Sequence, residues 1–99
     1  MAKFLIEVPH EEDVVACAQA VQILLSTGSH FLTNADWGCC DGEHKAWVIV
    51  DLESKEQAKA ILPPEYRPVA KIVQLNKFTR EEIDELLNSH QSAISQTAS

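Results

Sequence analysis

Residue types that bind metals or transfer protons gather in one short part of the sequence, HFLTNADWGCCDGEHKAW, which spans residues 30–47. The stretch holds two histidines, two adjacent cysteines, three acids and two tryptophans. Thiolate and imidazole are preferred ligands of zinc and other soft ions, and imidazole also transfers protons near neutral pH. If the sequence encodes a readable chemical function, we expect it in or beside this stretch.

A metal site would use His10, Cys39, Cys40 and His44. The predicted sheet topology brings these four residues to one edge of the sheet. The adjacent cysteines lack the CxxC spacing that places two thiolates tetrahedrally around one ion. The alternative is a polar hairpin tip with Asp-Gly turn chemistry and incidental thiols. We favour this alternative, and so predict no metal and no cofactor. A thiol-redox role for Cys39 or Cys40 would need a lowered pKa, which the neighbouring acids oppose.

A pocket for acid–base chemistry is the stronger hypothesis. Glu7 would be the general base and His44, or else His10, the group that shuttles a proton. Four other side chains would bind the substrate: Asn34, Trp47, Arg67 and Gln74. In the competing interpretation Glu7 pairs with Lys71 or Lys3 across strands, and His44 is a solvated residue at a strand start.

Composition and charge limit the classes of protein and partner. The 99 residues are 45% hydrophobic and 23% charged, which fits one globular domain. The formal net charge of -7 argues against nucleic acid and against anionic membranes, which both need basic surfaces. We find no signal peptide and no membrane span, and we read the odd set of three cysteines as reduced thiols. We therefore expect a cytoplasmic protein.

Hydrophobic periodicity and turn residues predict the elements that must position these side chains. We expect four strands, at residues 3–8, 30–37, 45–52 and 70–78. We expect three helices, the first between the acids at 11–13 and Gly28, the second over 54–62, and the third from Thr79. Ser54 with Gln57, and Thr79 with Glu82, are capping-box signatures. Residues 1–91 would form one domain, followed by a disordered tail at 92–99.

This order predicts an α+β protein with a ferredoxin-like βαββαβ sheet, strand order 4-1-3-2 and an added C-terminal helix. Strand alternation predicts one apolar face, which the helices cover: Phe4, Ile6, Val8, Ala46, Val48, Val50, Val73 and Leu75. The other face mixes apolar with polar side chains: Leu5, Trp47, Ile49 and Ile72 with Glu7, Asp51, Gln74 and Asn76. Which side chains the second strand adds to this mixed face is left open. Cys17, on the apolar stripe of the first helix, is predicted to be a core residue.

The mixed face is too apolar to stay in water, so the terminal helix, a partner's sheet or a ligand should cover it. With this face, the topology resembles the dimeric α/β-barrel superfamily, which includes muconolactone-isomerase-like and small monooxygenase-like proteins. The resemblance spans nearly the whole chain and implies a homodimer with a small-molecule pocket. Two functions therefore stay open. One is a small-molecule enzyme or binding protein acting through Glu7, His44 and Arg67, and the other is a non-catalytic dimerisation or protein-interaction module. A metal- or thiol-based site at the hairpin is a further alternative.

Overall fold

A computed structural model gives the fold of residues 1–26 and 30–98, with side chains described as far as His90. The elements in chain order are β1 (Ala2–Pro9), α1 (Val14–Ser26), the short 3-10 helix η1 (His30–Asn34), β2 (Asp36–Trp37), the 3-10 helix η2 (Cys39–Asp41), β3 (Lys45–Leu52), α2 (Lys55–Ala60), the 3-10 helix η3 (Pro64–Tyr66), β4 (Lys71–Leu75) and α3 (Arg80–Ala98). The described residues thus combine four strands with three α-helices, and the predicted α+β class is confirmed.

The four strands form one sheet in the order β2-β3-β1-β4, and each neighbouring pair is antiparallel. Read from the opposite edge, this order is 4-1-3-2. The long strands β1 and β3 pair along their whole length, from Ala2 opposite Leu52 to Pro9 opposite Lys45. The ferredoxin-like assignment and the dimeric barrel stay predictions.

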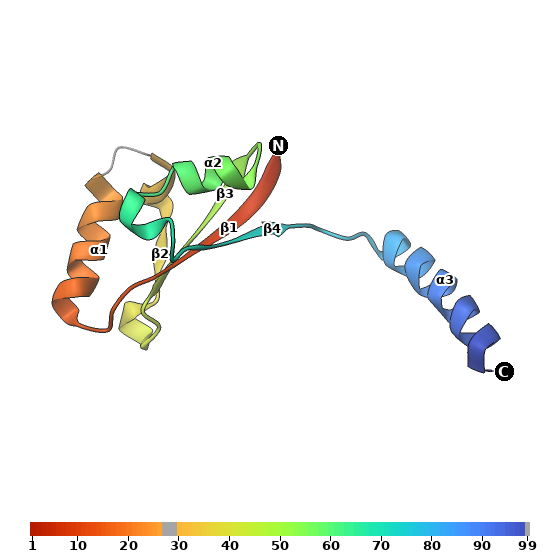
Figure 1. Ribbon diagram of the computed structural model, residues 1–99. Helices are drawn as coiled ribbons and strands as arrows, with labels where there is room; N and C mark the ends of the chain where they lie inside the picture. The colour runs from red at the N-terminus through yellow and green to blue at the C-terminus, as the bar shows by residue number, and fades with distance from the viewer. Residues whose placement is uncertain (27–29, 99) are drawn as a thin grey trace.

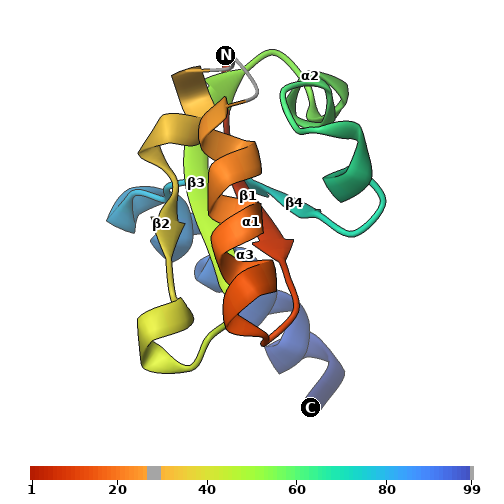
Figure 2. The same cartoon turned by 90° about the vertical axis from the view of Figure 1, so that its left-hand side faces the viewer.

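The core lies on one face of the sheet, under α1 and α2 (Figures 1 and 2). Alternate residues of β1 and β3 are buried there, namely Phe4, Ile6, Val8, Ala46, Val48 and Val50. The cluster is completed by Leu24 of α1, Leu32 of η1, Leu52 at the end of β3, Ala58 of α2 and Leu62 after α2. Fully burying a large apolar side chain stabilises a fold by about 1.5–3 kcal/mol, so this face holds the domain together.

The register of β4 corrects the predicted faces. Ile72 lies opposite Ile6 and Gln74 opposite Phe4, so both belong to the core-facing side. Val73 lies opposite Leu5 and is therefore on the other face, where it is 37% exposed. A shift of one residue exchanges the faces of a whole strand, and the sequence prediction for β4 was wrong by that one residue.

The second predicted strand is largely helical, which is a second correction. Residues 30–34 form η1, and only Asp36 and Trp37 pair with β3. The Thr33 hydroxyl donates a hydrogen bond to the carbonyl of His30 at 2.7 Å, a local bond that competes with strand pairing. Of the two residues in β2, Asp36 lies opposite Trp47 on the mixed face.

Side-chain caps start the helices where the sequence predicts. The Asp13 carboxylate accepts a hydrogen bond from the amide of Ala16 before α1. The Ser54 hydroxyl accepts from the amide of Gln57 before α2, and the Thr79 hydroxyl accepts from the amide of Glu82 before α3. At both predicted capping boxes, the hydroxyl bonds the amide three residues later.

The last helix, α3, projects away from the sheet beyond β4 (Figure 1). This gives the described chain an elongated shape, with principal extents of 61 × 30 × 22 Å. The predicted tail at 92–99 falls within the last turns of α3 and on the undescribed Ser99, and side chains beyond His90 lie outside the described residues, so a separate tail stays a prediction. Within the described residues, no helix combines the length and hydropathy needed to cross a membrane.

Candidate metal centre

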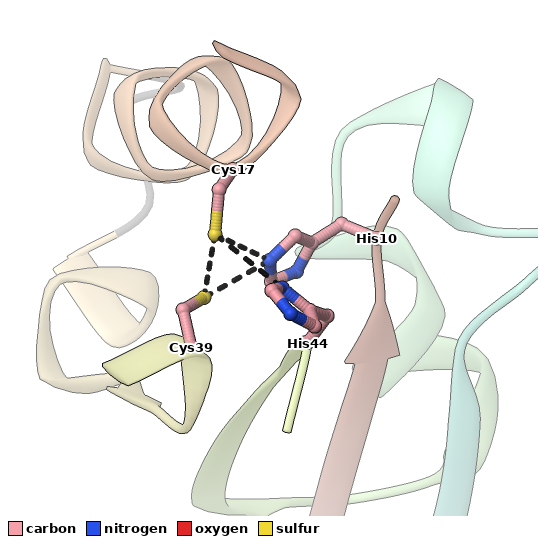
Figure 3. A group of neighbouring side chains, drawn as sticks. All are labelled: His10, Cys17, Cys39 and His44. Atoms are coloured by element: carbon pink, nitrogen blue, oxygen red, sulfur yellow. Dashed lines mark hydrogen bonds between the residues drawn. The ribbon is translucent and has the colours of Figure 1, made fainter. Parts of the chain in front are cut away.

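Four potential metal ligands converge at one end of the sheet, in the space between β1, α1 and the β2–β3 hairpin (Figure 3). They are His10, Cys17, Cys39 and His44, and one ligand atom from each lies within 4.8 Å of all the others. All four residues are half-buried. The set consists of two thiols and two imidazoles drawn from three separate parts of the fold.

Strand pairing places the two histidines side by side. The amide of His10 donates to the carbonyl of His44 at 3.0 Å, which extends the β1–β3 ladder beyond Pro9. Two residues further into the sheet, Val8 lies opposite Ala46 on the buried face. By strand alternation, His10 and His44 therefore belong to the face that α1 covers. Their ring centroids are 5.7 Å apart.

A tightly bonded loop holds Cys39. The carbonyl of Gly38 accepts hydrogen bonds from the amides of Asp41 and Glu43, at 2.9 and 3.0 Å. Gly42 follows with a φ of +80°, a left-handed conformation that glycine adopts without steric cost. This loop turns Cys39 inward and leaves Cys40 exposed.

Cys17 comes from the first turns of α1. Its amide donates to the carbonyl of Asp13 at 2.9 Å, so regular α-helical hydrogen bonding has begun at Cys17. Its side chain is half-buried and points at the hairpin instead of joining the main apolar cluster (Figure 3). The prediction that Cys17 is a core residue was wrong, because the early turns of α1 face the end of the sheet where the hairpin loop closes.

The distances between ligand atoms describe a compact cluster. Cys17 Sγ lies 2.8 Å from His10 Nε2 and 2.7 Å from Cys39 Sγ. Cys39 Sγ lies 3.0 Å from His10 Nε2, and Cys17 Sγ lies 4.0 Å from His44 Nδ1. Zinc bonds of about 2.3 Å to sulfur and about 2.0–2.1 Å to nitrogen place tetrahedral ligand atoms roughly 3.3–3.8 Å apart. Small side-chain shifts therefore suffice to bring these four atoms to tetrahedral spacing.

The protonation tendencies of the cluster follow from its crowding. The hydrogen bond with Cys39, together with burial, raises the pKa of Cys17 to about 11. Burial and the charge of His44 lower the pKa of His10, which favours a neutral imidazole. Within the described residues, His10 Nδ1 is buried without a hydrogen-bond partner, and Nε2 is the ring nitrogen directed at the sulfurs. Neutral imidazole binds metals directly, whereas a thiol must first lose its proton.

The structure includes three of the four residues from the sequence hypothesis for a metal site and replaces the fourth. His10, Cys39 and His44 meet, whereas Cys40 is exposed and Cys17 takes the remaining position. The predicted topology could have indicated Cys17, because a helix that starts just after β1 must begin beside the hairpin tip. The helical spacing of Cys17 indicates that it faces the sheet, but it does not specify that this residue lies at the end next to the hairpin.

The residues predicted for an acid–base pocket do not gather in one place. Glu7 lies opposite Trp47 on the mixed face and accepts a hydrogen bond from Trp47 Nε1 at 3.0 Å. Lys45 Nζ lies 3.9 Å from the same carboxylate oxygen. His44 belongs to the opposite, α1-covered face, so the structure does not bring Glu7 and His44 together. Glu7 is paired, as in the competing interpretation, but with Trp47 and Lys45.

The remaining predicted substrate-binding residues are also dispersed. Asn34 ends η1 and is exposed. Arg67 donates to the carbonyls of Leu62 and Ala60, at 3.0 and 3.2 Å, and so closes the loop after α2. Gln74 is exposed on the core-facing side of the edge strand β4. Their predicted roles in substrate binding stay predictions.

The chain was compared with known proteins at the level of family, sequence and structure. No protein-family model, curated protein or solved structure matches it. The four-residue cluster is therefore interpreted from its own chemistry.

Proposed function

We propose that this protein binds one zinc ion through His10, Cys17, Cys39 and His44. The observation that carries the proposal is the convergence of two sulfurs and two imidazole nitrogens within 4.8 Å of one another. A tetrahedral set of two sulfurs and two nitrogens is the donor chemistry of zinc, whereas calcium and magnesium take oxygen ligands. The chemistry of the donors thus fits a borderline-soft divalent cation.

The number of ligands favours a structural ion. Catalytic zinc sites use three protein ligands and keep the fourth position for water or substrate, whereas structural sites are closed by four. Here four protein ligands are available around one point. Zinc would therefore join the end of β1, the start of α1 and the β2–β3 hairpin, and would stabilise that end of the domain.

This proposal corresponds to the further alternative from the sequence, a metal- or thiol-based site at the hairpin, and it departs from the expectation of no metal. The small-molecule alternative placed Glu7 and His44 in one pocket, and its support weakens because these residues lie on opposite faces of the sheet. The raised pKa of Cys17 argues against a reactive thiolate at this residue, because reactive cysteines have lowered pKa values. The redox role predicted for Cys39 or Cys40 stays a prediction.

Metal analysis of paired cysteine variants tests the proposal. Purified protein is stripped with a chelator, reloaded with Zn²⁺ and desalted, and zinc per chain is measured by mass spectrometry. We expect one zinc per chain in the wild type and in Cys40→Ser, and strong losses in Cys17→Ser and Cys39→Ser. Cys40→Ser is the matched control, because it changes the cysteine next to a ligand without touching the cluster.

Loading with Co²⁺ adds a spectroscopic readout of geometry. Tetrahedral cobalt with thiolate ligands gives intense visible bands and a sulfur-to-metal charge-transfer band, and both should disappear in Cys17→Ser. Wild-type protein that retains no zinc would overturn the proposal. Equal losses in Cys40→Ser and Cys17→Ser would also overturn it, because they would indicate nonspecific thiol binding.

A further inference from the structure

One face of the sheet carries an apolar patch that α1 and α2 leave uncovered. Strand register places five apolar side chains of β1, β3 and β4 on this face, namely Leu5, Trp47, Ile49, Val73 and Leu75. Ile49 is 58% exposed and lies directly opposite Leu5. Exposed apolar patches of this kind usually mark an interaction surface.

The same chain supplies an unused helix with a complementary apolar stripe. On α3, Ile83, Leu86, Leu87 and His90 follow the i, i+3, i+4, i+7 spacing and share one side. Leu86 is 53% exposed and Leu87 is 50% exposed. The helix stands clear of the sheet in Figure 1, so its stripe does not cover its own domain's patch.

The dimensions of the helix and the patch agree. The 19 residues of α3 span about 28 Å at 1.5 Å per residue. The eight residues of β1 span about 26 Å at 3.3 Å per residue. A hollow of about 810 Å³ lies at the end of this face, lined in part by Lys3, Ile49, Leu75 and Lys77.

The hinge between β4 and α3 directs the helix outward. Residues 76–79 contain no glycine and no proline, form no turn, and run as an extended connection from β4 to α3 (Figure 1). The Thr79 hydroxyl accepts from the amide of Glu82 and fixes the start of α3 just after this hinge. An extended hinge that holds an element away from its own domain is the arrangement in which two chains exchange that element.

We propose that two copies of this chain form a dimer by exchanging α3, with each helix covering the sheet patch of the other copy. The contact is isologous, because the helix of one copy meets the sheet of its partner and the reverse contact is identical. The twofold axis then covers the sheet patch and the α3 stripe of both copies. The proposal is independent of zinc binding, because the metal ligands lie on the α1-covered face.

Charged side chains border both apolar surfaces. The first turns of α3 carry four exposed acids, Glu81, Glu82, Asp84 and Glu85, and one basic residue, Arg80. On the patch side of the sheet, Lys3 lies opposite Asp51 and Lys71 lies opposite Glu7, so acids of the same face balance these lysines. The pairing therefore rests on the apolar contact.

Light scattering of full-length variants after size-exclusion chromatography tests the exchange. We expect wild type at twice the chain mass. Leu87→Glu on the helix and Ile49→Thr on the sheet should each raise the dimer dissociation constant by about tenfold or more. Ile49→Thr keeps a β-branched residue in β3, which protects the strand itself. Leu25→Glu is the matched control, because Leu25 of α1 is also a leucine and is 53% exposed, close to the 50% of Leu87.

Each result decides the proposal. A dimer that both variants weaken, with Leu25→Glu unchanged and circular dichroism intact in all, supports exchange of α3. A dimer that Ile49→Thr weakens but Leu87→Glu does not overturns it, because the two sheets would then stack without the helix. A wild-type monomer at tens of micromolar also overturns it.

Discussion

Gly38 occupies a position in the hairpin where no side chain fits. A Cβ atom there would lie 2.7 Å from the Trp47 ring and 2.8 Å from the backbone carbonyl oxygen of Glu43. We expect Gly38→Ala to destabilise the protein by about 1–3 kcal/mol, because the backbone of the loop must shift. The shift would also displace Cys39, so zinc affinity should fall together with the urea midpoint.

Gly42 provides the control for this substitution. It has a φ of +80°, and a Cβ atom there would meet nothing within 4 Å. Gly42→Asn keeps a residue that tolerates the left-handed conformation, and we expect a smaller loss of stability than in Gly38→Ala. Equal losses in the two variants would contradict the steric explanation.

The protonation of the ligands predicts the pH dependence of zinc binding. The raised pKa of Cys17 keeps this group a thiol at neutral pH, so zinc must displace its proton on binding. Binding therefore releases protons, and affinity should rise with pH and fall on acidification. We expect zinc release as the pH falls from about 7 to about 5, because protons then compete with zinc for the ligand atoms.

A chromogenic chelator that reports free zinc measures this release. Cys40→Ser should release zinc at the same pH as wild type, because Cys40 is exposed outside the cluster. A pH-independent zinc content over this range would contradict coordination by thiolate and imidazole.

Single residues of the candidate site were predictable only in part. The predicted topology alone brings His10, Cys39 and His44 to one edge of the sheet. The choice between Cys17 and Cys40 depended on the loop around Gly38, which turns Cys39 inward and Cys40 outward. The directions of adjacent side chains depend on the local backbone geometry, which sequence spacing alone does not specify.

At the scale of elements, Arg67 closes the segment that links α2 to β4. Its guanidinium donates to the carbonyls of Leu62 and Ala60 beyond the end of α2. We expect Arg67→Ala to lower stability by about 1 kcal/mol, because the charge-assisted bonds are lost at an exposed site. Arg67→Lys should recover only part of this, because an ammonium does not reproduce the planar fork of donors.

Urea unfolding measures both Arg67 variants. Zinc stoichiometry should stay at the wild-type value, since Arg67 contacts the α2 segment and none of the four ligands. A variant with unchanged stability and altered ligand binding would instead favour the substrate role predicted from the sequence.

The central strands were predictable in full, and the edge strands only in part. The pattern of β1 and β3 is strong because both strands lie in the middle of the sheet and bury every second side chain. At the sheet edges the constraint is weaker. The register of β4 was displaced by one residue, and residues 30–34 form a 3-10 helix because local bonds replace a strand partner.

At the scale of the whole molecule, zinc should be linked to global stability. The ligands come from β1, α1 and the hairpin, and an ion that binds only the folded chain stabilises it by mass action. With free zinc about a thousandfold above its dissociation constant, the gain is about 4 kcal/mol. For a domain of this size that corresponds to roughly 15 °C or more in Tm.

Differential scanning calorimetry with and without a strong chelator measures this effect. Cys17→Ser should unfold near the temperature of the chelated wild type and should not respond to added zinc. Cys40→Ser should behave as the loaded wild type. A wild-type Tm that the chelator leaves unchanged would contradict zinc binding at the four-residue cluster.

The two proposed sites occupy opposite faces of the sheet and opposite ends of its long strands. The metal ligands follow Pro9 and precede Lys45, whereas the hollow under the exchanged helix begins at Met1, Lys3 and Asp51. Sites that share no contacts act additively. We therefore expect Leu87→Glu to weaken the dimer without changing zinc affinity, and Cys39→Ser to lose zinc while the folded fraction still dimerises. Zinc titrations at concentrations above and below dimer dissociation measure the coupling. Zinc affinity that changes with protein concentration would show that zinc binding and dimerisation are coupled. The coupling would then run through β1, the strand that borders both sites.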